Sequence, residues 1–175
     1  LPPCVNHSEA EYSVEAQADG ALAVRYALAG LKNVGEKAME QLVADRMENG
    51  AFASLEDFAG RIDPTLINKR SFENLASAGA FDALYANRAA LVEGADVVLA
   101  TAQSAREERA SGQGGLFGEA SGGAQPMRLP STPEWSAGAQ MAREKDAFGF
   151  YFAAHPVSQF RAVAMAKGAQ SHAAI

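Results

Sequence analysis

Apolar residues recur at helical spacing through most of the chain after residue 27, and this pattern most constrains the fold. The residues that share a helix face are Val34, Ala38, Met39, Leu42 and Val43, then Phe72, Leu75 and Ala76, then Leu91, Ala95, Val98, Ala102 and Ala105. Such spacing is typical of amphipathic helices. Alanine, the commonest residue, favours closely packed helices, whereas a large sandwich or barrel would need more β-branched and aromatic residues. We therefore predict a mainly α fold.

Capping and breaking residues set the expected helix boundaries. The N-cap candidates are Ser54, which is followed three residues on by an acid, Asn68 and Asn87. Stop signals are Gly50, Gly79 and the pairs Asp63-Pro64 and His155-Pro156. Together they predict a long helix from Asn87 to about Ala110, a helix from near Glu134 to about Ala154, and a short helix over 157–167.

The N-terminal part of the chain shows a different pattern. Residues 11–16 and 22–26 alternate between apolar and other side chains, with Asp19-Gly20 between them. Asp-Gly supplies the positive φ angles of a tight turn, so we predict a β-hairpin and expect no other sheet. Residues 111–133 are rich in glycine and proline, which predicts a mobile loop or linker. The expected organisation is a hairpin segment over 1–28, a helical region over 29–110, the loop over 111–133 and a last helical segment over 134–175.

Composition excludes several classes of function. The 15 lysines and arginines against 21 acids give a net charge of −6, which excludes a protein that coats nucleic acid by charge alone. The single cysteine, Cys4, excludes an internal disulfide framework and favours a reducing, cytoplasmic location. No stretch approaches the roughly 18 apolar residues of a membrane span. Because no methionine opens the chain, we expect it to be a piece of a longer protein.

Residues with catalytic or metal-binding chemistry are scattered. His7, His155 and His172 lie far apart without acidic partners at metal-binding spacing, and surface or capping roles suit them better. No nucleophile arrangement surrounds Cys4. The acids Glu56-Asp57 suit the N-terminus of a helix. We therefore predict no catalytic residue, metal ion or cofactor within this chain.

One turn has the features of a phosphate site. Asn33-Val34-Gly35 leads directly into a predicted helix, and Lys32 and Lys37 flank it. A glycine lets the backbone approach a partner closely, and the helix behind it presents unpaired N–H groups with a partial positive charge. These features suit a DNA phosphate. The alternative is an ordinary helix-turn-helix corner. A Walker loop is excluded, because Ala38 follows Lys37 where serine or threonine is required.

A second motif, Gln113-Gly114-Gly115-Leu116-Phe117, places two large apolar residues in a glycine-rich loop. Exposed apolar side chains of this kind are typical of contacts with a partner. A flexible loop can deliver Leu116 and Phe117 into a pocket on another protein, while Gln113 anchors them by hydrogen bonds. The alternative is that both side chains fold back on the core of their own chain.

Short motifs along the chain occur in an order that resembles one protein family. They are Leu1-Pro2-Pro3-Cys4-Val5-Asn6, Val24-Arg25-Tyr26-Ala27-Leu28, Leu31-Lys32-Asn33-Val34-Gly35, Phe52 through Phe58, Asn68-Lys69-Arg70, Ala78-Gly79-Ala80-Phe81-Asp82, Asn87-Arg88-Ala89-Ala90-Leu91, Gln113 to Phe117, and Phe148-Gly149-Phe150-Tyr151 before His155-Pro156. Over about residues 1–165, the chain thereby resembles the alpha subunits of bacterial DNA polymerase III, the C-family replicative polymerases.

The resemblance implies a tandem helix-hairpin-helix region that holds duplex DNA by its backbone, without sequence preference. Segment 1–28 would be the end of the polymerase fingers. Asn33-Val34-Gly35 would be the first hairpin, and Ala78-Gly79-Ala80 its degenerate second copy. The DNA-binding residues expected from this resemblance are Lys32, Asn33, Val34, Gly35, Lys37, Lys69, Arg70 and Gly79.

The resemblance also implies a second contact, because Gln113, Leu116 and Phe117 match the internal motif that binds the sliding clamp. Gly114-Gly115 depart from the bulkier central residues often found there. The catalytic aspartates of the family, which use magnesium, lie upstream, and an oligonucleotide-binding fold normally follows. The piece would therefore support processive replication without polymerising DNA, and would meet other replicase subunits through the parent chain.

Three other interpretations stay open at this point. The chain could be a helix-hairpin-helix scaffold from a repair nuclease or ligase, with no clamp contact. It could belong to an error-prone paralogue of the same polymerase. It could also be a purely structural helical domain, which the net charge of −6 favours. Binding to the sliding clamp through Leu116 and Phe117 separates the first of these from the replicative enzyme, and the intact pentapeptide argues mildly against the second.

Overall fold

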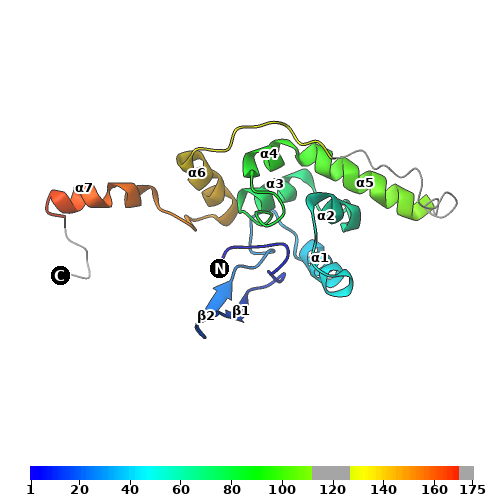
Figure 1. Ribbon diagram of the computed structural model, residues 1–175, viewed down its shortest axis with the longest axis horizontal. Helices are drawn as coiled ribbons and strands as arrows, with labels where there is room; N and C mark the ends of the chain where they lie inside the picture. The colour runs from blue at the N-terminus through cyan, green and yellow to red at the C-terminus, as the bar shows by residue number, and fades with distance from the viewer. Residues whose placement is uncertain (112–126, 170–175) are drawn as a thin grey trace.

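The computed structural model describes residues 1–111 and 127–169, and within these ranges the chain is mainly helical (Figure 1). The elements in chain order are β1 (Ser13–Ala16), β2 (Leu22–Arg25), α1 (Glu36–Asn49), α2 (Leu55–Arg61), α3 (Lys69–Ser77), α4 (Arg88–Glu93), α5 (Ala95–Ser111), α6 (Ala137–Phe148), the 3-10 helix η2 (Pro156–Phe160) and α7 (Arg161–Ala166). The predicted mainly α fold with a small N-terminal hairpin is therefore confirmed.

The hairpin forms where the alternation predicts it. β1 and β2 pair antiparallel with Ser13 opposite Arg25, and Gly20 takes a positive φ of 82° in the connecting turn. The Arg25 guanidinium donates to Glu15 at 2.8 Å and lowers the pKa of that carboxyl. The apolar residues of the hairpin lie on its solvent side, with exposed fractions of 57–75% at Tyr12, Val14, Leu22 and Val24.

One hydrophobic core joins the N-terminal segment to the helices. Three phenylalanines, Phe58, Phe72 and Phe81, are fully buried at its centre, and Phe58 meets Phe81 edge to face at 4.8 Å. Val5 is fully buried in the same cluster, and its amide donates to Ala80 O at 2.9 Å. Burial of such side chains stabilises the fold by about 1.5–3 kcal/mol each. Segments 1–28 and 29–110 therefore share a core.

The predicted helix caps are confirmed by hydrogen bonds. The Ser54 hydroxyl accepts from Asp57 N at 3.1 Å, and the Asp57 carboxylate reaches back to accept from Ala53 N at 2.9 Å. The Asn68 side chain accepts from Ser71 N at 2.9 Å, and Asn87 accepts from Ala90 N at 3.1 Å. Each cap satisfies an amide that the first helical turn leaves without a partner.

The predicted single helix from Asn87 to Ala110 is wrong, because the structure divides it at Gly94 into α4 and α5. Gly94 is the C-cap of α4. A Cβ on Gly94 would stand 2.6 Å from Leu129 Cδ2 and 3.0 Å from Pro130 Cδ. The segment that carries these side chains crosses over α4 before α6 (Figure 1). Glycine at this position therefore leaves room for the two side chains.

The predicted helix from Glu134 to Ala154 is also too long. Ser136 caps α6, which begins at Ala137, and Gly149 ends it at Phe148 with a left-handed φ of 88°. The aromatic residues near its end pack on Tyr26 instead of extending the helix. Phe148 and Phe152 stack with ring centroids 4.5 Å apart, and Tyr26 meets Phe148 edge to face at 4.8 Å.

The last described segment lies apart from the helical body. After His155, η2 and α7 project away from α6 (Figure 1). The short helix predicted over 157–167 is confirmed as η2 followed by α7. Within residues 1–111 and 127–169, we find no helix with the length and apolar character that a membrane span requires.

Candidate nucleic-acid interface

The first turn, defined here as residues 32–37, joins β2 to α1 through a series of tight turns. Leu31 N donates to Leu28 O and Val34 N to Leu31 O, each at 3.3 Å. Asn33 takes a left-handed φ of 60°, which asparagine tolerates better than most residues. Gly35 is the N-cap of α1, in an extended conformation, and no side chain caps the helix. The turn therefore delivers the chain directly into an uncapped helix N-terminus.

The backbone amides of this turn are free to bind an anion. Among the described residues, the amides of Asn33, Gly35, Glu36 and Lys37 have no hydrogen-bond acceptor. Nothing in that part of the chain stands within 4 Å of where a Cβ on Gly35 would be. The α1 dipole places partial positive charge at the same point. A phosphate oxygen can therefore approach the backbone at Gly35 without a steric clash.

The side chains of the first turn divide into two groups. Lys32, Asn33 and Lys37 are exposed, as the prediction that they contact DNA requires. The Val34 side chain is only 8% exposed and belongs to the core cluster. Val34 therefore anchors the turn to the protein, and only its backbone remains for a DNA contact.

The second turn, residues 78–80, has a different environment. The amides of Ala78, Gly79 and Ala80 donate to the carbonyls of Asn74, Ala76 and Leu75, each at 3.0 Å. Gly79 is buried with a φ of +83°, and a Cβ there would stand 2.2 Å from an Arg88 guanidinium nitrogen. This turn has no amide to offer a phosphate, so its geometry gives no support to a DNA contact at Gly79.

Arg88 closes the surface over the second turn. Its guanidinium donates to Asp82 at 2.5 Å and to Glu144 at 2.9 Å. Burial opposes the charge of Arg88, but the hydrogen bonds with Asp82 and Glu144 outweigh it and raise the arginine pKa. Glu144 is only 4% exposed, so the pair ties α6 to α4. Sequence reasoning did not select these residues, since nothing in the spacing of positions 88 and 144 links them.

The remaining predicted DNA contacts lie in the first turn of α3. Lys69 donates to Asp96 at 2.6 Å, and this hydrogen bond raises the pKa of the lysine. Arg70 is exposed. Lys69 is thus held toward α5 by an acid that neutralises its charge, while the pair stays exposed to solvent.

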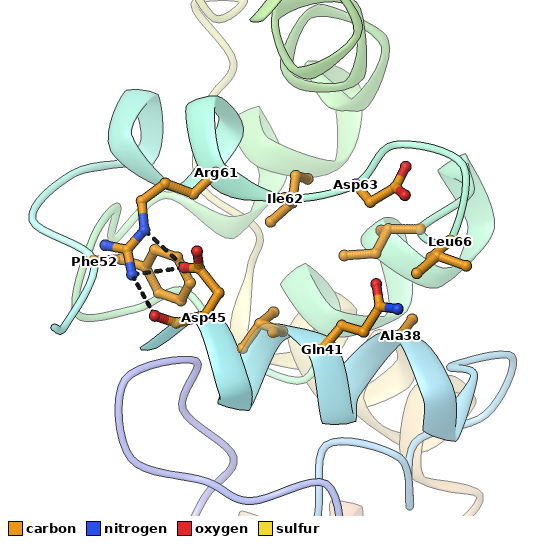
Figure 2. A pocket seen from close by; sticks show the side chains of 10 residues that line it. Ala38, Gln41, Asp45, Phe52, Arg61, Ile62, Asp63 and Leu66 are labelled. Carbon is orange, nitrogen blue, oxygen red and sulfur yellow. Dashed lines mark hydrogen bonds and ion pairs between the residues drawn. The ribbon is translucent and has the colours of Figure 1, made fainter. Parts of the chain in front are cut away.

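A pocket of about 150 Å³ lies between α1 and the end of α2 (Figure 2). Arg61 at its rim donates to Asp45 at 2.8 Å, to Gly50 O at 2.8 Å and to Asp57 at 3.1 Å, and its guanidinium lies 4.2 Å from the centre of the Phe52 ring. Through these contacts the arginine joins α1 to α2.

Two groups of predicted residues remain. Gln113, Leu116 and Phe117 lie outside the described residues. Within residues 1–111 and 127–169, no group of three or more His, Cys, Asp or Glu side chains is placed to hold a metal ion. Cys4 is a partly buried free thiol. Among the described residues, the candidate interface is therefore the first turn with its two lysines.

Comparisons with known proteins agree with this geometry. A family model described as "Helix-hairpin-helix motif" matches residues 1–91. The chain is 48% identical over 155 residues to DNA polymerase III subunit alpha of Caulobacter vibrioides, covering 89% of this chain and 13% of that protein. It is 36% identical over 160 residues to the same subunit of Neisseria meningitidis serogroup B, covering 91% of this chain and 14% of that protein.

A third relative, DNA polymerase III subunit alpha of Campylobacter jejuni, is 36% identical over 162 residues, covering 91% of this chain and 13% of that protein. The chain therefore spans only a small part of the length of the curated relatives it matches. The matched region includes both turns and the helices around them. The chain belongs to the helix-hairpin-helix motif family and corresponds to a segment of a DNA polymerase III alpha subunit.

Proposed function

We propose that this chain is a non-catalytic segment of a DNA polymerase that grips the backbone of duplex DNA through its first turn. One observation carries the proposal: exposed amides at Asn33, Gly35, Glu36 and Lys37, without acceptors among the described residues, lie between two exposed lysines. Backbone amides and lysines bind phosphate oxygens and do not distinguish base edges, so binding is independent of sequence. The net charge of −6 confines the contact to this turn.

The parent protein is, on this proposal, a DNA-directed DNA polymerase that works in the cytoplasm, as the names of the relatives support. Its magnesium-dependent catalytic residues lie outside this chain. The first turn holds the duplex by contacts that are the same at every base pair. Such contacts let the enzyme advance along DNA without releasing it, which suits a replicative polymerase.

The proposal includes a second partner, a sliding clamp bound by Gln113, Leu116 and Phe117. A tether to a clamp keeps the polymerase at a high effective concentration beside its DNA site. The test compares clamp binding of the chain with that of a Leu116→Ala/Phe117→Ala variant by surface plasmon resonance. We expect the variant to lose binding. Equal binding by both proteins would contradict the clamp contact and leave a helix-hairpin-helix scaffold as the better account.

The test of DNA binding is the salt dependence of affinity for a labelled duplex, measured by fluorescence anisotropy. Contact with two to four phosphates predicts a slope of log K against log salt of roughly −2 to −4, from about −0.9 per phosphate. A Lys32→Ala/Lys37→Ala variant should bind more weakly and should lose about 2 from the magnitude of this slope. Two duplexes of unrelated sequence should bind equally.

The matched control removes the same charge from another region. Arg161→Ala/Lys167→Ala changes two exposed basic residues on and beside α7, which projects away from the helical body. We expect the control to bind DNA with the slope of the unmodified chain. Affinity independent of salt, or an equal loss in both double variants, would contradict binding at the first turn.

A further inference from the structure

The peptide groups of Lys32 are held on both sides by segments far away in the sequence. Lys32 N donates to Ala147 O, at the end of α6, at 2.9 Å. Lys32 O accepts from the side-chain amide of Asn74 on α3. The two bonds fix the peptide groups on either side of Lys32. The next amide along the chain, that of Asn33, is the first of those without an acceptor among the described residues.

The end of α6 also contacts the Lys32 side chain. Gly149 ends the helix with a φ of +88°, and a Cβ there would stand 3.0 Å from Lys32 Cε and 3.4 Å from Lys32 Nζ. Both atoms belong to the lysine that we place beside the DNA phosphate. Glycine at position 149 therefore adopts the left-handed conformation that ends α6, and it leaves room for the aliphatic part of the Lys32 side chain.

No helix comes directly before the first turn, and the contacts of Lys32 with Asn74 and Ala147 fix its backbone instead. The second turn follows α3, a complete helix, whose carbonyls accept its amides. The first turn follows β2 and a series of tight turns. A turn without a preceding helix needs other contacts to fix its backbone, and Asn74 and Ala147 O supply them. Both bonds are made by Lys32, and the amides of Asn33, Gly35, Glu36 and Lys37 have no acceptor among the described residues.

We propose that Asn74 and the end of α6 at Gly149 are positioning elements for DNA binding, which hold Lys32 and the amides after it in the orientation that accepts a phosphate. The inference rests on the proposed function of the first turn. It adds that residues of α3 and α6 set its affinity without touching DNA. Pre-organised donors bind a phosphate more tightly than donors that must first be ordered.

The test uses the full chain with Asn74→Leu, which keeps a similar volume and removes the donor. We expect about fivefold weaker binding to the duplex, the effect of one lost hydrogen bond on the bound orientation. The salt slope should stay unchanged, because both lysines remain. Asn74→Gln, which retains a donor, should recover part of the affinity. A merely structural role would instead lower thermal stability and leave the affinity of the folded protein unchanged.

A second variant pair tests the end of α6. Gly149→Ala imposes backbone strain and a contact with Lys32, whereas Gly168→Ala imposes the same strain, at a φ of +86°, with nothing among the described residues within 4 Å of the added Cβ. We expect Gly149→Ala to weaken DNA binding and Gly168→Ala to leave it unchanged. Circular dichroism confirms that each variant is folded at the temperature of the binding measurement.

The outcomes separate this inference from the proposed function. If Lys32→Ala/Lys37→Ala does not change binding, the first turn is not the DNA site and both proposals fail. If that variant loses binding while Asn74→Leu and Gly149→Ala bind like the unmodified chain, only the positioning role is wrong. Weaker binding by Asn74→Leu with a reduced salt slope would also contradict it, because a lysine contact would then have been lost.

Discussion

The two turns of this chain share a pattern of small residues around a glycine but differ in what surrounds them. At the first turn, Gly35 is exposed, and the amides of Asn33, Gly35 and Glu36 have no acceptor within the described part of the chain. At the second turn, Gly79 is buried under Arg88, and its amide donates to Ala76 O. The same pattern thus makes an open anion site in one place and a closed helix end in the other.

This difference shows that a glycine-containing turn is not by itself a phosphate site. The decisive property is whether the amides of the turn already have acceptors. A complete helix before the turn, such as α3, supplies carbonyls that occupy those amides. At the first turn the preceding chain is a strand followed by tight turns, so the amides at the start of α1 remain for a ligand.

Replacing Gly79 and Gly35 by alanine gives the largest expected difference in stability between the two turns. Gly79→Ala forces a left-handed alanine and displaces Arg88 from Glu144, so we expect a loss of about 2–4 kcal/mol in the free energy of unfolding. Gly35→Ala has open space and an ordinary φ of −79°, and should change stability by less than about 0.5 kcal/mol. Urea denaturation measures both. Equal losses would contradict the difference in packing.

Glu144→Gln sharpens the account of the second turn. The substitution removes the buried charge that pairs with Arg88, while Asp82 still pairs with the arginine. We therefore expect a loss of about 2 kcal/mol in the free energy of unfolding, below that of a fully unpaired buried charge. The affinity of the folded protein for duplex DNA should not change. Weaker DNA binding by the fully folded Glu144→Gln variant would show that the second turn takes part in the interface.

Gly35→Ser should change stability and DNA affinity in opposite directions. The extended conformation of Gly35 suits a serine N-cap, whose hydroxyl accepts from an amide of the first helical turn. We expect a few tenths of a kcal/mol of added stability. The same hydroxyl occupies an amide that the phosphate would use, so DNA binding should fall about fivefold. Tighter DNA binding by this variant would refute the proposed use of the amides.

Asp96→Asn has the smallest expected effect and tests the partner of Lys69. The hydrogen bond with Asp96 raises the pKa of Lys69 above the ordinary lysine value of about 10.4. A lysine pKa that is higher in the folded than in the unfolded chain stabilises the fold at pH values below the ordinary lysine pKa. This stabilisation is lost as the pH rises through the pKa of the folded state. The substitution should lower the Lys69 pKa in an NMR titration. DNA affinity should rise less than about twofold, because Lys69 stays exposed to solvent.

Local signals in the sequence predicted most helix starts. Ser54, Asn68 and Asn87 each cap the helix that follows, because an N-cap requires only a side-chain oxygen and amides two or three residues away. The hairpin was predictable for the same reason, since the alternation of residues and the Asp-Gly turn are local. The sequence did not predict that the apolar side of the hairpin is exposed, because which side of a strand is buried depends on the segments that pack against it.

The errors occurred at two glycines inside otherwise continuous helical patterns. Gly149 ends α6 in the left-handed conformation, which is a local stop signal, and the aromatic rings of Phe150 and Phe152 after it lie beside Tyr26 near the start of the chain. Gly94 ends α4 where Leu129 and Pro130, from a segment distant in the sequence, pack against it. Helical periodicity continues through both positions, so the sequence pattern alone predicts longer helices.

For the candidate site, the sequence by itself determined the motif, the two lysines and the glycine at the start of α1, because these residues are neighbours in the chain. The amides of the second turn are occupied by carbonyls of the preceding helix, which is local in the sequence. Only the tertiary structure decided that Arg88, bound to Glu144, covers Gly79, and that Asn74 and Ala147 hold Lys32. These contacts join segments separated by tens of positions, and a local pattern of residue types does not encode which distant segments pack together.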